Sequence, residues 1–151
     1  MLNSLSDFLK NGLSRNKPAE PGSSGGRTDL AAAVLMVEIS LADSSLDNDE
    51  RRLILKLLRD EFHLTPDESE SILTLAQEES DHAVSMHEFT RLINEALSAD
   101  EKVRIIELLW QVAFADSVLD KYEEYYIRKI ADLLYIPHKD YIMAKHRSAA
   151  E

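Results

Sequence analysis

Residues 42–50 read Ala-Asp-Ser-Ser-Leu-Asp-Asn-Asp-Glu, and the pattern returns 73 positions later, at residues 115–123, as Ala-Asp-Ser-Val-Leu-Asp-Lys-Tyr-Glu. Over residues 42–56, eight of fifteen positions are identical at that offset. Each copy follows an almost continuously apolar run, 30–42 or 103–115, and precedes a segment with apolar residues at helical spacing. We therefore expect each copy to be a buried helix, an acidic turn and an amphipathic helix. Two such copies predict an all-α bundle with an internal pseudo-two-fold repeat.

Signals for helix starts divide the remaining sequence. A Ser, Thr or Asp followed three residues later by Glu has the spacing of a capping box, which pairs the two side chains with backbone N–H groups. This spacing occurs at Asp47 with Glu50, Thr65 with Glu68, Ser85 with Glu88, Ser98 with Glu101 and Asp120 with Glu123, and a last helix is expected over 138–149. The expected apolar stripe of the helix after the first acidic turn is Leu53, Ile54, Leu57, Leu58 and Phe62. No segment alternates with period two, so we predict a helical bundle of about seven helices and no sheet.

The charge of the chain restricts its partners. The net charge is −11, and residues 1–30 hold four basic and three acidic side chains, so the other 121 residues carry −12. Such a surface repels nucleic-acid phosphates and anionic membranes, whereas it suits cations or a basic patch on a protein. We therefore expect divalent cations as partners, keep another protein as a second candidate, and expect no nucleic acid. The sequence does not indicate an oligomeric state.

Several classes of site and location are excluded or not expected. The absence of cysteine excludes disulfides, thiolate zinc sites and cysteine nucleophiles. No apolar run approaches the roughly 20 residues that a membrane span needs. The N-terminus lacks the pattern of a secretory signal, so we expect a cytoplasmic protein. Neither a Gly-rich phosphate loop nor a G-x-S-x-G elbow occurs, and no catalytic pair of carboxylates is evident, so we do not expect an enzyme.

The N-terminal part differs in composition from the rest. Residues 1–13 form a short amphipathic segment whose apolar residues are Leu2, Leu5, Phe8, Leu9 and Leu13. A helix this short is marginal alone, so three outcomes stay open: it docks on the core, binds a partner or stays frayed. Residues 14–27 have the composition of a flexible linker. A helical domain is expected over residues 28–151, because Thr28 and Asp29 are both good helix N-caps.

The acidic residues of the repeated turn differ in how well they suit their positions. Asp47 and Asp120 are expected to cap helices, where a carboxylate is favourable. Asp43 and Asp116 are expected at the C-terminal ends of helices, where the helix dipole disfavours negative charge. Two explanations remain: an Asx-turn within the backbone, or a hard divalent cation held by carboxylate, carbonyl and hydroxyl oxygens. The spacing alone favours the Asx-turn, and it does not match an EF-hand.

Two further segments carry a family resemblance. Residues 89–94 read Phe-Thr-Arg-Leu-Ile-Asn, and residues 109–116 read Leu-Trp-Gln-Val-Ala-Phe-Ala-Asp and lead into the second acidic signature. Together with the two signatures, and in this order, they make residues 30–147 resemble the tellurite-resistance TerB-like family, in particular its stand-alone subgroup. The resemblance implies an all-helical bundle, acidic residues that bind metal, and an association with tellurite and metal stress.

The resemblance makes metal binding the favoured interpretation of the acidic turns. The candidate ligands that it implies are Asp43, Asp47 and Glu50 in the first copy and Asp116, Asp120 and Glu123 in the second. The divalent metal ion stays open among Ca²⁺, Mg²⁺ and Zn²⁺. One departure from the family is Ser44, with Ser117 in the second copy, where Gly is common; Ser adopts a left-handed backbone less readily. The alternative function is an acidic protein-interaction module in which the turns are only helix caps.

Glu38 and Gln111 occupy equivalent positions, 73 residues apart, on the two apolar helices. A buried polar group needs hydrogen-bonding partners. Two interpretations follow: these residues support the acidic turns from behind, or they lie at a partly exposed edge of their helices. Of the two, we expect the exposed edge.

Overall fold

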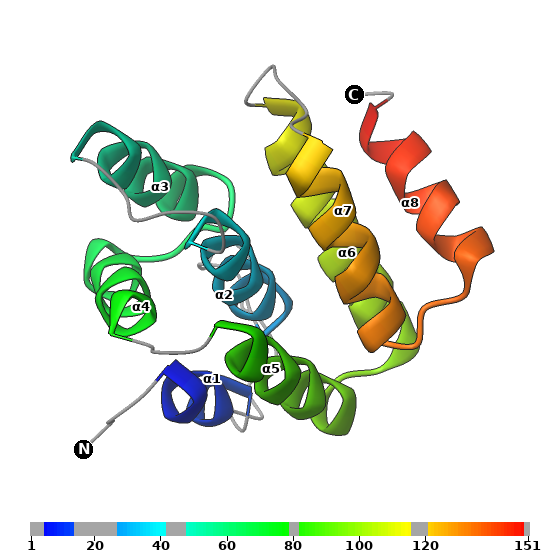
Figure 1. Ribbon diagram of the computed structural model, residues 1–151, viewed down its shortest axis with the longest axis horizontal. Coiled ribbons are helices and arrows are strands. Elements are labelled where there is room, and N and C mark those ends of the chain that lie inside the picture. The colour runs from blue at the N-terminus through cyan, green and yellow to red at the C-terminus, as the bar shows by residue number, and fades with distance from the viewer. Residues whose placement is uncertain (1–4, 14–26, 42–47, 79–81, 116–120, 150–151) are drawn as a thin grey trace.

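The computed structural model describes residues 5–13, 27–41, 48–78, 82–115 and 121–149 of the chain. Over these ranges it contains eight helices and no strand (Figure 1). The helices are α1 (Leu5–Leu13), α2 (Arg27–Leu41), α3 (Asn48–Asp60), α4 (Pro66–Gln77), α5 (His82–Ala96), α6 (Ala99–Ala115), α7 (Lys121–Leu133) and α8 (His138–Ala149). The predicted all-α class is confirmed. The linker expected over 14–27 lies outside the described residues except for Arg27, whose backbone begins α2.

Helix α2 is the centre of the molecule. Helices α1, α4, α5 and α6 all pack against it, and every residue from Leu30 to Ile39 is buried. A helix that is apolar on all sides is stable only when neighbours surround it, because each exposed side would leave apolar surface in water. The prediction of a central buried helix at this position is confirmed.

The C-terminal helices form a second group around α6. Helix α8 packs along α6, and α7 packs against both α6 and α5 (Figure 1). Trp110 of α6 is fully buried, and its ring lies 5.9 Å from the ring of Tyr141 on α8, centroid to centroid. Trp110 is thus part of the core between α6 and α8.

Helix α3 packs on α4 at the edge of the bundle. Arg51 links the two helices, since it donates one hydrogen bond to Gln77 Oε1 (2.6 Å) and another to Glu70 Oε2 (2.7 Å). Ile54 and Leu58 are buried as predicted, whereas Leu53 is 43% exposed, so its place in the apolar stripe is wrong. The buried row runs at four-residue spacing, and Leu53 lies about 100° around the helix from Ile54, on the solvent side.

The helix bounds follow the 73-residue offset. Adding 73 to the bounds of α3 gives 121 and 133, which are the bounds of α7; the shifted bounds of α2 and α4 fall within one residue of those of α6 and α8. The packing of the two halves differs, because α3 packs on α4 whereas α7 packs on α6. A pseudo-two-fold arrangement in space therefore stays a prediction.

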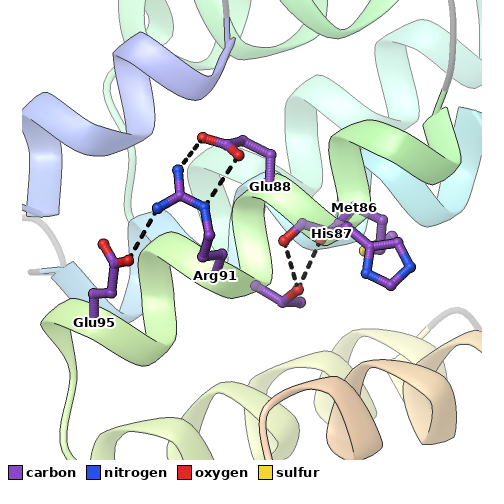
Figure 2. A network of polar contacts seen from close by, with 6 residues as sticks. Met86, His87, Glu88, Arg91 and Glu95 are labelled. Carbon is purple, nitrogen blue, oxygen red and sulfur yellow. Dashed lines mark hydrogen bonds and ion pairs between the residues drawn. The ribbon is translucent and has the colours of Figure 1, made fainter.

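Two of the predicted capping boxes are present and a third is not. The Thr65 N–H donates to Glu68 Oε1 (3.0 Å) while Thr65 Oγ1 accepts from the Glu68 N–H (3.1 Å), and Ser98 and Glu101 make the same pair of bonds at 3.0 and 3.2 Å. The predicted start at Ser85 is wrong, because α5 begins at His82. Ser85 thus lies inside the helix, and Glu88 instead accepts hydrogen bonds from the guanidinium of Arg91 at both of its carboxylate oxygens (Figure 2).

Helix α1 docks on the core, which resolves the three outcomes left open for the N-terminal segment. Its Leu5, Leu9 and Leu13 are buried, and it packs against α2, α4 and α5. Among the described residues, no helix is both long enough and apolar enough to cross a bilayer.

Candidate functional site

The two acidic signatures connect a buried helix to an amphipathic one in each half of the chain. Helix α2 ends at Leu41 and α3 begins at Asn48, while α6 ends at Ala115 and α7 begins at Lys121. The four candidate ligands in these connections, Asp43, Asp47, Asp116 and Asp120, lie outside the described residues. Glu50 and Glu123 are each the third residue of their helix, α3 and α7, and their side chains also lie outside the description.

The helix ends that lead into both signatures are electrically alike. Neither α2 nor α6 has a basic residue in its last turn. The C-terminal end of a helix carries a partial negative charge from its unsatisfied carbonyl groups. Each signature therefore continues, with an aspartate as its first charged residue, from a helix end that is already negative and carries no cationic side chain.

Glu38 adds a carboxyl group to the last turn of α2. It is fully buried, so the exposed edge expected for it is wrong; Gln111, its equivalent on α6, is half-buried. The reason is that α2 has neighbours on every side, so no position along its middle faces solvent. For Glu38, the interpretation that is left is a buried polar group in the last helical turn before the first acidic signature.

The described residues contain no second candidate for a metal centre. Within them, no three His, Asp or Glu side chains come together closely enough to hold an ion. The four histidines whose side chains are described, His63, His87, His138 and His146, are all exposed. His63 Nδ1 lies 3.6 Å from Asp29 Oδ2, a contact that joins the start of α2 to the segment between α3 and α4. Among the described side chains there is therefore no alternative to the acidic turns as a candidate metal centre.

The segment 89–94, which carried part of the resemblance, has an architectural role. Phe89 and Ile93 are fully buried, and Thr90 Oγ1 donates to the carbonyl oxygens of its own helix at Met86 and His87, each at 3.0 Å (Figure 2). Arg91 lies outside, between Glu88 and Glu95. The buried side chains of Phe89 and Ile93 thus help to set how α5 lies in the bundle.

Asn94 ties three helices together. Its Nδ2 donates to the carbonyl oxygen of Leu133 (3.0 Å), and its Oδ1 accepts from Lys102 Nζ (3.1 Å). Asn94 thus binds an unsatisfied carbonyl at the C-terminal end of α7 and at the same time holds a lysine of α6. The sequence signal for this role is a polar residue directly after a buried apolar pair, but its partners lie too far away in the chain to be read from the pattern.

The segment 109–116 contributes a polar contact beside the second signature. Lys145 Nζ of α8 lies 4.9 Å from the centroid of the Trp110 ring and 2.9 Å from Glu124 Oε1 of α7. Burial raises the pKa of the neighbouring Tyr141, the negative charge of Glu124 adds to that increase, and Arg128 opposes it. Glu124 directly follows the candidate ligand Glu123 in the first helical turn of α7. Lys145 therefore links α7 to α6 and α8 at that helical turn.

Comparisons with known proteins identify the family. A family model described as "Tellurite resistance protein TerB" matches residues 29–146, from the first turn of α2 to the last turn of α8. Neither the curated proteins nor the solved structures give a match. The match covers most of the chain and leaves α1 outside it. Since the family model matches more than half of the chain, the chain belongs to the TerB tellurite-resistance family.

Proposed function

We propose that this TerB-family chain is a divalent-cation-binding helical module rather than an enzyme, and that it acts in the response to tellurite or metal stress. The proposed ligands are Asp43, Asp47 and Glu50 in the first turn and Asp116, Asp120 and Glu123 in the second. Family membership supports the stress role, and the described helix ends support the binding role.

The observation that carries the proposal is that each signature directly follows the C-terminal end of a packed helix, α2 in the first half and α6 in the second. Both helices end without a basic residue, so the aspartates that follow gain no compensation from the last helical turn. Negative charge at a helix C-terminus costs about 0.3–1 kcal/mol at an exposed site. A bound cation would convert this cost, and the repulsion among three acids, into attraction. The same arrangement at both signatures argues for a shared role.

The donor chemistry suits a hard cation. Carboxylate, hydroxyl and backbone carbonyl oxygens are the ligands of Ca²⁺ and Mg²⁺ in proteins, and Zn²⁺ also accepts carboxylates. The contribution of this chain would be to hold the oxygens on segments anchored by two packed helices. The residues fit such an ion, and binding needs no catalytic group.

Cation-dependent melting of the full chain tests the proposal. An ion present at one hundred times its dissociation constant stabilises the folded state by about 2.7 kcal/mol, which should raise the melting temperature by about 5–10 °C in a chain of this size. We expect at least one of Ca²⁺, Mg²⁺ and Zn²⁺ at millimolar concentration to produce such an increase. The variant Asp43→Asn with Asp116→Asn should lose it.

A matched control separates ligand loss from charge loss. Asp60→Asn with Asp132→Asn removes the same charge from the other ends of α3 and α7, where both side chains are exposed. This control should keep the cation response of the wild type. If all three ions leave the wild-type melting temperature unchanged, the turns are only helix caps and the proposal is wrong.

A further inference from the structure

The residue that follows the last candidate ligand ties each amphipathic helix to the helix that ends its half of the chain. In the first half this residue is Arg51 of α3, which donates to Gln77 Oε1 and Glu70 Oε2 of α4. In the second half it is Glu124 of α7, 73 positions later, which accepts a hydrogen bond from Lys145 Nζ of α8 at 2.9 Å. The two ties thus connect equivalent helices with the charges reversed.

This reversal puts a carboxylate directly after the last candidate ligand in the second half only. In the first half the carboxylate of the tie belongs to α4, and the residue beside Glu50 is a cation. Glu124, by contrast, is joined by one peptide unit to the candidate ligand Glu123, so the two Cα atoms are about 3.8 Å apart. Carboxylate oxygens are what a hard cation binds. A divalent ion at the second signature can therefore compete for the group that makes the tie.

Both members of this ion pair can change partners at little cost. The side chains of Glu124 and Lys145 are 46% and 32% exposed, so the pair lies at the surface rather than in the core. Lys145 Nζ also lies 4.9 Å from the centroid of the Trp110 ring, within the range of a cation–π contact. Without Glu124, the ammonium group would still have the ring and water as partners, which avoids the penalty of an unpaired buried charge.

We propose that Glu124 is a further carboxylate of the second cation site, and that Lys145 is its built-in competitor, which occupies Glu124 until a divalent ion displaces it. This inference rests on the proposed cation binding at the acidic turns. Because Lys145 belongs to the same chain, it lowers the affinity of the second turn at every protein concentration. The neighbouring acid of the first turn, Asp49, pairs with Arg52 at 3.8 Å with both side chains largely exposed, and such a pair contributes little.

Calorimetric titration of the full chain with CaCl₂, MgCl₂ and ZnCl₂ tests this competition. The titrated chains carry Asp43→Asn, so that the heat comes from the second turn. Adding Lys145→Met should tighten binding about fivefold, because a partly exposed ion pair no longer has to be broken. Arg147→Met is the matched control, since it removes the same charge from α8 and an ion pair with Glu107 of α6. It should leave the affinity within about twofold of the parent, because salt screens a distant charge.

Glu124→Gln separates competition for this carboxylate from a general effect of charge. It removes the carboxylate at nearly constant volume, so the second turn should bind the ion more weakly than in the parent. Adding Lys145→Met to Glu124→Gln should then change the affinity by less than about twofold, because the group for which Lys145 competes is gone. A merely structural role of Lys145 would produce no gain in affinity.

The results distinguish this inference from the proposed function. If the wild type binds none of the three ions, the proposed function is wrong, and this inference with it. If the wild type binds an ion but the Asp43→Asn chain does not, or if Lys145→Met binds it no more tightly than Arg147→Met, only the competition is wrong. An equal gain from Lys145→Met with and without Glu124 would also contradict the proposal, because the ammonium group would then act only as a distant charge.

Discussion

Replacement of Asn94 by alanine tests whether the 89–94 segment of the TerB family is architectural. The variant removes the hydrogen bond to the Leu133 carbonyl oxygen and the one from Lys102 Nζ. A hydrogen bond contributes about 1 kcal/mol net, and the partly exposed contact with Lys102 is given the same value, so we expect a loss of about 2 kcal/mol. In a chain of 151 residues this corresponds to a fall in melting temperature of about 4–8 °C.

Thermal unfolding followed by circular dichroism measures this loss, and two companions sharpen it. Lys102→Met should cost about 1 kcal/mol in the wild type and little in Asn94→Ala, because the contact is already gone there. Glu95→Ala, at the adjacent exposed position, should change stability by no more than about 0.5 kcal/mol. The reasoning is refuted if Asn94→Ala melts within about 1 °C of the wild type, or if Asn94→Ala leaves stability intact and removes the cation response.

Two further perturbations address contacts elsewhere in the bundle. Lys145→Met keeps an unbranched apolar side chain near Trp110 but removes the charge, so it should lower the free energy of unfolding in urea by about 0.5–1.5 kcal/mol. Lys139→Met, exposed on the same helix, should be neutral, and equal effects of the two variants would contradict the contact. Burial raises the pKa of Asp29 above its ordinary value of 3.8, against the opposing charges of His63 and Arg104. The folded state therefore holds this proton more tightly than the unfolded state, and stability is lost as pH rises from 3.8 through the raised pKa. Asp29→Asn should be more stable than the wild type at pH 7, with the advantage vanishing as pH falls to 3.8; denaturation curves at both pH values decide it.

The parts of the fold that the sequence predicts correctly are those governed by local pattern. The continuous apolar run of α2 has only one stable position, inside the bundle, and the capping spacing at Thr65 and Ser98 fixes two helix starts because both partners lie within one turn. The same rule failed at Ser85, because α5 begins three residues earlier, at His82, and Ser85 lies inside the helix. A capping pair therefore fixes a helix start only when the residues before it are not helical themselves.

What the sequence could not predict depends on contacts distant in the chain. Three leucines in α1 are compatible with docking, partner binding or fraying, and only the surface of α2, α4 and α5 decides among these. Glu38 looked like an edge residue because charge is usually exposed, and the ring of neighbours around α2 overrides that tendency. The links made by Asn94 and Lys145 span 39 and 21 residues, beyond any helical period. The proposed acidic ligands were predicted from the repeated signature and the family resemblance alone.

The single tryptophan gives the two halves of the chain different optical properties. Trp110 is the only indole in the sequence, it lies in the helix that leads into the second acidic turn, and the cation of Lys145 lies over its ring while binding Glu124 of α7. The equivalent position in the first half, 73 residues earlier, is Val37. Tryptophan emission responds to nearby charge, so the intrinsic fluorescence of the native chain should follow changes at the contact between Lys145 and Glu124, in the half of the chain that carries the second signature. If cations bind as proposed, a titration that combines this emission with calorimetry would test, without any label, whether the second half responds to the ion.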